Sequence, residues 1–359
     1  MKTTVVRPGE LDTTALTVWR SLLGRQEAAS PFLSPEFARA VGRFRPGARV
    51  AVLEDGRGPV GFFPFERRPL GLGRPIGDGV CDCQGLVGDA GATGPDGVGD
   101  SAELLRACGL QVWQFDHLAA GQPLFAPGVA RRATSPVVVC ADTEPGAVLA
   151  HASSAFRRDV RTKEHRLARR AGDVRFVFDS HDPEALEALM AWKSAQYRAK
   201  GRIDQFSRPW VAATVRELLR AGSPACSGTL SVLYADHRPV ACHFGLRSRS
   251  VLTYWFPAYD PAWASCSPGI LLLVGILRAA AEAGLHHVDL GRGDDRYKTQ
   301  LKTGDLVVGE GQVSRPTARA ALRSAESAAV GRTRSLVAGN PVLRGAAVGT
   351  LNAWLRRGA

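Results

Sequence analysis

The chain has 359 residues, of which 45% are hydrophobic and 22% are charged, and these proportions are ordinary for a soluble globular protein of one or two domains. Its formal net charge of +12 at pH 7 comes from two segments, because residues 151–175 carry +5 and residues 315–359 carry +7. The remaining residues together carry no net charge. This distribution is weak evidence for nucleic-acid binding, and it suits an acidic ligand, an acidic partner or an anionic membrane surface at least as well.

Disulfide-rich, zinc-binding, secreted and membrane-spanning proteins are all disfavoured. The seven cysteines form an odd set without a framework spacing, and beside Cys81 and Cys83 no second Cys or His pair stands at zinc-ligand distance. The N-terminal residues lack the apolar stretch of a secretory signal. The longest strongly apolar run, residues 270–277, is far short of the ~20 residues that a membrane span needs. We therefore expect a cytoplasmic protein with reduced thiols and no metal.

Residues 1–150 are expected to form a first domain. Helical periodicity and a Ser-Pro start signal predict two early helices, and apolar runs on both sides of an Asp-Gly pair predict a β-hairpin. A stretch rich in Gly and Asp then indicates loops around short strands. The elements expected here are a helix over Thr14–Leu23, a helix from Ser34, a hairpin around residues 55–56 and a strand over Leu110–Leu118.

Residues 151–315 are expected to form a second domain, which begins with the basic helix "SSAFRRDVRTKEHRLARRAG". Phe156, Val160, Leu167 and Ala171 fall on one face of this helix, and the arginines lie elsewhere. After it we expect a strand over 174–178, helices over 183–200 and around 210–219, three strands with tight turns at 236–238 and 247–249, an apolar helix, and the strand "HHVDL". Each half has an early helix followed by a hairpin, which hints at a diverged duplication.

Residues 316–359 form a third segment, an Ala- and Arg-rich tail that includes "NPVLRGAAVGTLNAWLRR". Its basic, amphipathic character is compatible with a packed terminal helix, a loose tail or a helix on a membrane surface. The packed and loose forms are favoured over the membrane form.

The stretch "SCSPGILLL" predicts the start of the apolar helix. Ser267 can cap the helix, Pro268 suits the first helical position, and Gly269 lets a ligand approach the backbone. About four N–H groups at such a start lack intrahelical partners, and with the helix dipole they form a potential anion site. A capped, buried helix without a ligand is the alternative. The stretch is neither a Walker A motif nor a dinucleotide-binding fingerprint.

The order of these elements, a meander, a loop at a helix start and a following strand, is similar to the cofactor-binding core of GNAT acyltransferases. Three stretches, "SSAFRRDVRTKEHRLARRAG", "ACHFGLRSRSVLTYWFPAYDPAWASCSPGILLL" and "HVDLGRGDDRYK", more closely resemble the CelD-type, cellulose-biosynthesis-associated GNAT-like acetyltransferases. "PFLSPEFARAV", "VGFFPFERR" and "DCQGLV" also resemble the N-terminal region of that family. The resemblance implies an α/β fold with a mixed sheet, in a tandem GNAT-like arrangement related to Fem-type aminoacyltransferases.

The resemblance also implies a donor site. Acetyl-CoA or another acyl-CoA would be the donor, with its pyrophosphate bound by backbone N–H groups of Ser267, Pro268, Gly269 and Ile270. The usual Gln/Arg-x-x-Gly-x-Gly/Ala loop is absent here. Arg292 or a nearby arginine is the candidate for the missing charge.

Candidate catalytic residues lie in the strand "ACHFGL" and in "DLGRGDDRYK". His243 is a candidate base near neutral pH, and the alternative is a hydrogen-bonded, half-buried histidine. Asp289 at a strand end is a second candidate, unless it caps the turn. Tyr297 is a candidate donor to the leaving thiolate. Direct transfer needs no covalent intermediate, so Cys242 and Cys266 are interpreted as packing thiols. Residues expected near the acceptor substrate are Tyr259, Arg292, Asp294, Asp295 and Lys298.

Three functions are compatible with these features. The first is an acyl-CoA-dependent N- or O-acyltransferase, with acetyl as the favoured acyl group, acting on a polysaccharide, a cell-envelope precursor or a small metabolite. The second is a Fem-type transferase that uses aminoacyl-tRNA, which the basic helix would contact and whose binding would weaken steeply with salt. The third is a catalytically silent GNAT-like binding or scaffold protein, which the unusual pyrophosphate loop favours.

Overall fold

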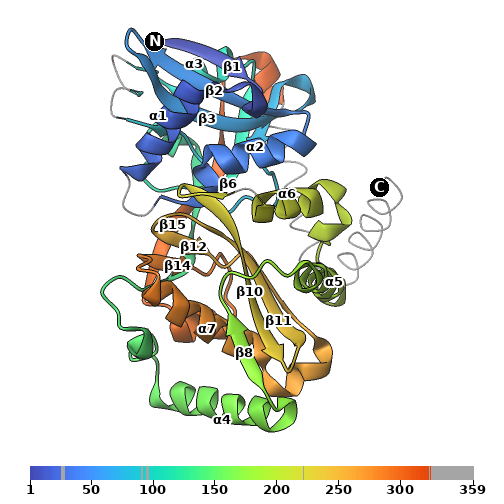
Figure 1. The fold of residues 1–359 in the computed structure, drawn as a ribbon. Coiled ribbons are helices and arrows are strands. Elements are labelled where there is room, and N and C mark those ends of the chain that lie inside the picture. Colours follow the sequence, from blue (N-terminus) through green and yellow to red (C-terminus); the bar gives the residue numbers. More distant parts are fainter. Residues whose placement is uncertain (26–28, 90–91, 94–96, 221, 323, 325–359) are drawn as a thin grey trace. The chain divides into compact units, whose positions relative to one another are not determined.

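The computed structural model describes residues 1–25, 29–89, 92–93, 97–220, 222–322 and 324 (Figure 1). Most of the predicted basic tail, residues 325–359, lies outside the described residues. The chain divides into two compact units, one made mainly of residues up to Thr134 with the described residues after Leu306, and one made mainly of Ser135–Leu306. This division differs from boundaries at 150 and 315 because two long strands, β7 (Val129–Val139) and β15 (Gly304–Ser314), each run from one unit into the other.

The first unit contains a mixed sheet in the order β1-β2-β3-β4-β6-β15. Neighbours are antiparallel except β4 and β6, which are parallel. The short strand β5 (Val87–Gly88) pairs with β3. The other elements are β1 (Lys2–Val6), α1 (Thr13–Gly24), α2 (Pro35–Phe44), β2 (Ala48–Asp55), β3 (Gly58–Arg67), β4 (Leu72–Pro75), α3 (Ser101–Ala107) and β6 (Val112–Leu118).

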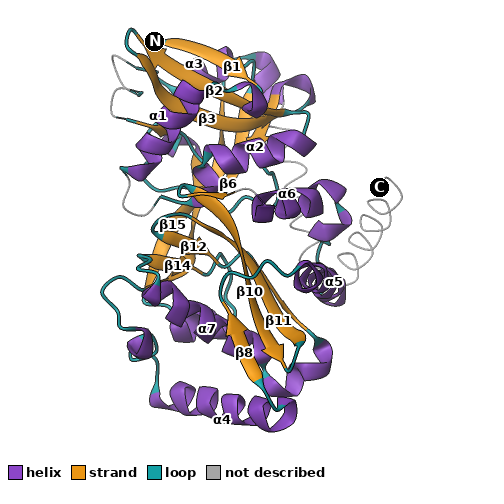
Figure 2. Ribbon diagram, in the orientation of Figure 1, coloured by secondary structure: helices purple, strands orange, loops and turns teal. Residues whose placement is uncertain are grey.

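The second unit contains a sheet in the order β7-β14-β12-β11-β10-β8. Helices α5 and α7 flank β10 and β11 on opposite sides (Figures 1 and 2). The short strand β9 (Gly222–Ser223) pairs with β10. The other elements are α4 (Ser154–Ala171), β8 (Val174–Val177), α5 (Pro183–Ala199), α6 (Pro209–Arg220), β10 (Cys226–Ala235), β11 (Arg238–Arg247), β12 (Val251–Thr253), β13 (Phe256–Tyr259), α7 (Pro268–Glu282), β14 (His287–Asp289) and α8 (Arg296–Leu301).

The two units repeat one order of elements. Each has a strand, two helices, an antiparallel hairpin, a further strand, a helix and a final strand, and in each unit this final strand runs parallel to the strand that follows the hairpin. A repeated order with the same strand directions is what a duplication produces. The mixed α/β fold in tandem arrangement, expected from the sequence, is therefore confirmed.

Helix α4 has the single buried face that its sequence predicts. Ser153 accepts a hydrogen bond from the backbone of Phe156 and caps the helix, and the buried residues are Phe156, Val160, Leu167 and Ala171. They pack in the same apolar core as the buried face of α7. The basic side chains of α4 consequently lie on its other faces, and Arg158, Arg161 and Arg169 are exposed.

Helix α7 is almost entirely apolar because most of its circumference is buried. Eight of its residues are buried, including Leu272, Leu273 and Leu277, which are fully shielded from solvent. Its apolar sequence is explained by this packing inside the second unit. Among the residues that the structure describes, no helix has both the length and the hydropathy to cross a bilayer.

Candidate functional site

The sheet of the second unit opens beyond the paired ends of β12 and β14. β12 pairs in parallel with β14 up to Thr253 and Asp289, and Tyr254 N–H still donates to Asp289 O at 2.7 Å. Beyond this point β13 pairs with β11, on the other side. The sequence predicts one continuous strand here, but the structure has two. The division depends on pairing with β14, more than thirty residues later, so local patterns do not reveal it.

Helix α7 begins close to this opening with a strained residue. Ser267 occupies the cap position with φ 52° and ψ 49°, in the left-handed region, and its side chain makes no capping hydrogen bond. The sequence predicts Ser267 as a side-chain cap, so the position is right and the interaction differs. Ile270 N–H donates to Ser267 O at 3.1 Å. Left-handed non-glycine residues cluster at functional sites, because the surrounding structure must hold them there.

The strain at Ser267 gives a stability prediction. Replacing Ser267 by glycine is expected to raise the free energy of unfolding by about 0.5 kcal/mol, because an L-residue in this region costs ~1–2 kcal/mol and glycine loses part of that gain through its entropy. Urea denaturation measures the change. Ala264→Gly, in the short helix just before, is the control and is expected to destabilise. A clear loss of stability in Ser267→Gly would contradict the strain argument.

Two arginines of α4 hold the segment that leads into α7. Arg166 Nη1 donates to Ser265 O at 2.8 Å, and Arg170 Nη1 lies 3.3 Å from Ser265 Oγ. The Arg170 guanidinium also stacks over the Trp263 ring, 4.3 Å from its centre. Part of the basic helix therefore positions the start of α7.

A cavity of about 460 Å³ opens at the start of α7. It lies within the second unit, and its walls come from α5 and the loop after it, from β13 and Tyr254, and from the starts of α7 and α8. The lining residues are Lys193, Gln196, Tyr197, Ala199, Lys200, Arg202, Tyr254, Pro257, Ala258, Tyr259, Ala264, Ser267, Gly269, Ile270, Asp295 and Tyr297.

The cavity has a cationic wall that sequence reasoning missed. Lys193, Lys200 and Arg202 line it, and Asp295 is the carboxylate among the lining residues. Burial, reinforced by neighbouring cations that include Lys200, Arg202 and Lys298, lowers the pKa of Lys193 to about 7. A net positive cavity beside a helix N-terminus has the electrostatic character that anions require.

The loop that carries Lys200 and Arg202 is held by a buried carboxylate. Asp204 is 2% exposed, accepts a hydrogen bond from Ser194, and forms an ion pair with Arg198 Nη1 at 2.9 Å. It also caps the short helix that follows by accepting from the backbone of Phe206. Asp204 thus ties the end of α5 to the loop after it.

Several of the predicted site residues line this cavity. They are Ser267, Gly269, Ile270, Tyr259, Asp295 and Tyr297. Burial, with a contribution from Asp295, raises the pKa of Tyr297. Its hydroxyl consequently stays protonated at neutral pH and is available as a proton donor.

Six other predicted residues are absent from the lining. Lys298 is buried and donates to the carbonyls of Gly291 and Arg292 at 2.9 and 3.0 Å, so its ammonium holds the turn after β14. Asp294 is exposed outside the cavity walls. Pro268 is buried at the first position of α7. The remaining three are His243, Asp289 and Arg292.

His243 is fully buried behind the cavity wall. Its ring stacks on Tyr254 with centroids 4.6 Å apart, and Nε2 donates to Thr253 O at 3.2 Å. Burial lowers the pKa of His243 to about 3, so the ring is neutral at physiological pH. The sequence leaves open a cleft-facing base or a hydrogen-bonded, half-buried histidine, and the structure has a hydrogen-bonded histidine that is fully buried and stacks on Tyr254.

Asp289 holds the turn that follows β14. Its Oδ1 accepts hydrogen bonds from Ser135 Oγ at 2.6 Å and from Gly291 N–H at 2.9 Å. It is half-buried and lies outside the cavity lining. These hydrogen bonds correspond to the alternative role considered for Asp289, in which it caps the turn.

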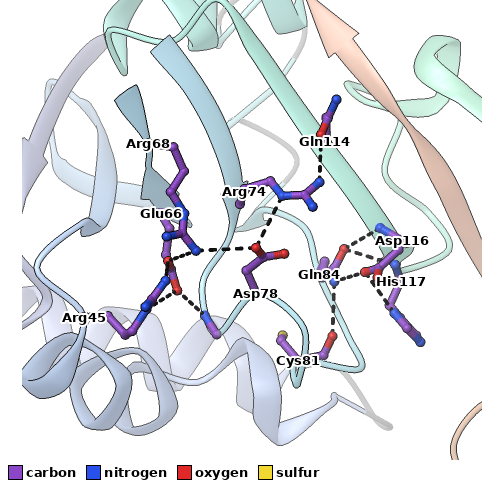
Figure 3. Close-up of polar contacts among 11 residues, drawn as sticks. Arg45, Glu66, Arg68, Arg74, Asp78, Cys81, Gln84, Gln114, Asp116 and His117 are labelled. Atoms are coloured by element: carbon purple, nitrogen blue, oxygen red, sulfur yellow. Dashed lines mark hydrogen bonds and ion pairs between the residues drawn. The ribbon is translucent and has the colours of Figure 1, made fainter. Parts of the chain in front are cut away.

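The first unit holds a separate polar cluster (Figure 3). Glu66 is 1% exposed and pairs with Arg45 at 2.7 Å and Arg68 at 3.0 Å. The buried Gln84 accepts from the backbone N–H groups of Asp116 and His117. The other members of the cluster are Arg74, Asp78, Cys81 and Gln114. Its polar groups satisfy one another, which is typical of a network that orders loops.

Comparison with known proteins assigns the fold of this site. Residues 154–299 match the family model of the acetyltransferase (GNAT) domain, a range that contains the whole cavity lining. No curated protein matches the chain. The structure is similar to FemX, with a TM-score of 0.58 and 11% identity over 87% of this chain and 96% of that one.

A second solved structure has a similar fold. It is the C-terminal domain of a protein described as a lysylphosphatidylglycerol synthetase from Agrobacterium fabrum, with a TM-score of 0.54 and 16% identity over 88% of this chain and 96% of that domain. Both structures match across the two units. The chain therefore has a tandem GNAT-like fold, and residues 154–299, within its second unit, are similar to the acetyltransferase (GNAT) domain.

Proposed function

We propose that the chain is an acyl-CoA-dependent acyltransferase, with acetyl as the favoured acyl group, that transfers this group directly to an amine or hydroxyl. The acceptor class we favour is a polysaccharide, a cell-envelope precursor or a small metabolite. The observation that carries the proposal is the cationic cavity at the start of α7, within a GNAT acetyltransferase domain. An acyl-CoA brings a pyrophosphate, which needs such a site.

The pyrophosphate is assigned to the helix start and the cations opposite it. The Gly269 amide at the second position of α7 has no acceptor within the helix, while Ile270 N–H already donates to Ser267 O. We assign to Lys200 and Arg202, which line the cavity, the charge for which the sequence suggests Arg292. These side chains take the place of the missing glycine-rich loop.

Direct transfer then needs two proton movements. The acceptor's nitrogen or oxygen attacks the thioester carbonyl, a bond to carbon forms, and the carbon–sulfur bond breaks. Tyr297 is the proposed donor to the departing thiolate, since its hydroxyl is protonated at neutral pH and it lines the cavity beside the start of α7. The groups behind the wall, His243 and Asp289, are assigned to positioning Tyr254 and the turn after β14.

Thermal unfolding with acetyl-CoA, free CoA and bulk tRNA tests the proposal. A ligand at 100 times its dissociation constant adds about 2.7 kcal/mol to the folded state, so we expect both CoA forms to raise the midpoint by several degrees. A rise with tRNA alone would contradict the proposal in favour of a Fem-type transferase. No rise with any of the three would favour a silent binding protein.

Two features favour the aminoacyl-tRNA alternative. Helix α4 exposes Arg158, Arg161 and Arg169, and the fold is similar to that of FemX. If α4 binds an RNA backbone, Arg158→Gln together with Arg161→Gln should weaken tRNA binding and reduce its dependence on salt. CoA binding should be unaffected, because neither residue lines the cavity.

Substitution of the two positioning residues gives a further prediction. His243→Ala and Asp289→Asn are expected to lower turnover more than acetyl-CoA affinity, because they disturb Tyr254 and the turn after β14 without touching the helix start. Steady-state kcat and the Kd of acetyl-CoA measure the two effects. Full activity in both variants would mean that neither residue has the proposed positioning role.

A further inference from the structure

The amine of Lys193 has an unusual environment for a lysine. Its Nζ donates to Pro257 O at 2.8 Å and to Gln196 Oε1 at 3.1 Å, and both acceptors are uncharged. Within the described part of the chain, no carboxylate forms an ion pair with it. A half-buried ammonium without a counter-ion is costly, so the neutral amine is favoured.

The hydrogen-bond count is compatible with the neutral form. A neutral primary amine has two N–H groups and one lone pair, whereas an ammonium has three N–H groups. The two acceptors on Lys193 use both hydrogens of the neutral form. The lone pair then takes part in neither of these hydrogen bonds. Lys193 also belongs to the cavity wall.

We propose that Lys193 Nζ is the base that takes the proton from the acceptor as it attacks the thioester. The inference rests on the proposed acyltransferase function and deepens it. The acceptor's N–H or O–H bond breaks, its proton moves to the Lys193 lone pair, the new bond to the acyl carbon forms, and the thiolate leaves with a proton from Tyr297. The resulting Lys193 ammonium loses its proton to water, while the Tyr297 phenolate regains one.

The surrounding charges suit a base that works near neutral pH. Lys200 and Arg202, on the loop after α5, and Lys298, on α8, disfavour the ammonium, while Asp295, next to α8, favours it. The neutral rings of His243, on β11, and Tyr197, on α5, are also near Lys193. Together with burial these groups bring the pKa of Lys193 to about 7, where a general base is most effective.

Competitive labelling tests the state of the amine without any turnover. The whole protein is treated with trace acetic anhydride from pH 5 to 11, and peptide mass spectrometry follows the labelling of each lysine. We expect a midpoint of about 7 for Lys193, against ~10.4 for an unperturbed lysine side chain. Lys200→Gln should raise the Lys193 midpoint, and Asp295→Asn should lower it.

Measurements of turnover test whether Lys193 acts as the base. CoA release from acetyl-CoA is followed with water alone and with small primary amines, for the wild type, Lys193→Met, Lys193→Arg and the surface control Lys302→Met. We expect release to rise with pH through the Lys193 midpoint in the wild type and the control. Both Lys193 variants should lose about 100-fold or more while they still bind acetyl-CoA.

Two results would overturn the assignment. One is a Lys193 labelling midpoint close to the ~10.4 of an unperturbed lysine, and the other is CoA release by Lys193→Met with the rate and pH profile of the wild type. Absence of acetyl-CoA binding in the wild type would instead count against the proposed function. The labelling result would then still decide whether Lys193 is neutral at physiological pH.

Discussion

Gly269→Asp is expected to weaken acetyl-CoA binding by about 100- to 1,000-fold. Two unit charges about 4 Å apart near a protein surface interact by roughly 4 kcal/mol, and each 1.4 kcal/mol corresponds to about tenfold in Kd. A carboxylate at the second position of α7 would face the donor's pyrophosphate. Isothermal titration with acetyl-CoA and with free CoA measures the loss.

Two further substitutions at this position separate charge from shape. A Cβ on Gly269 would meet Tyr259 at an ordinary 3.4 Å, so Gly269→Ala should fold normally and bind within a few-fold of the wild type. Gly269→Asn has the shape of the aspartate without its charge and should fall between the two. Unchanged CoA affinity in Gly269→Asp would mean that the pyrophosphate does not bind at the start of α7.

Features that depend on neighbouring residues in the sequence were predictable. The buried face of α4 follows from apolar residues at helical spacing, and the start of α7 follows from the Ser-Pro-Gly order at 267–269. The conformation of Ser267 was not predictable in the same way. Its left-handed backbone depends on the preceding segment, which Arg166 fixes from a helix about one hundred residues earlier.

Features that depend on distant pairing were missed. The division between β12 and β13 requires β14, and the burial of His243 requires Tyr254 to close over it. The sequence nevertheless contains a signal for the cationic wall. Lys193, Gln196 and Tyr197 recur at helical spacing in "WKSAQYRAKGR", so they share one face of α5, and Lys200 follows at the same spacing just after the helix ends. Polar residues on one helical face are ordinarily a solvated surface, and only the structure shows that this face lines a cavity.

In the proposed mechanism, different residues of one cavity bind the donor and move the protons. Gly269 and Ser267 come from the start of α7, Tyr297 from α8, and Lys193 from α5, and all four line the cavity. Donor binding is assigned to the start of α7 together with Lys200 and Arg202, and proton removal to Lys193. Substitutions at the start of α7 should therefore affect mainly Kd, and substitutions of Lys193 mainly kcat.

Glu66→Gln in the first unit is expected to lower the free energy of unfolding by about 3 kcal/mol, since breaking a buried ion pair leaves the partner charge uncompensated. Glu66 pairs with Arg45 and Arg68 and also accepts from Gly77 N–H at 3.2 Å (Figure 3). The substitution keeps the shape of the side chain but removes the charge that two guanidinium groups share. Urea denaturation of the full chain, followed by tryptophan fluorescence, measures the change.

The matched control is Glu54→Gln, which removes the partner of Lys2 on the neighbouring strand. That pair is largely solvated, with side chains 78% and 30% exposed, so its loss should cost under about 1 kcal/mol. If the two units unfold separately, Glu66→Gln should move the transition of the first unit alone, and acetyl-CoA should move that of the second. Equal, small effects of both glutamate variants would mean that the cluster around Glu66 adds little to stability and that the loops it joins are held by the apolar core instead.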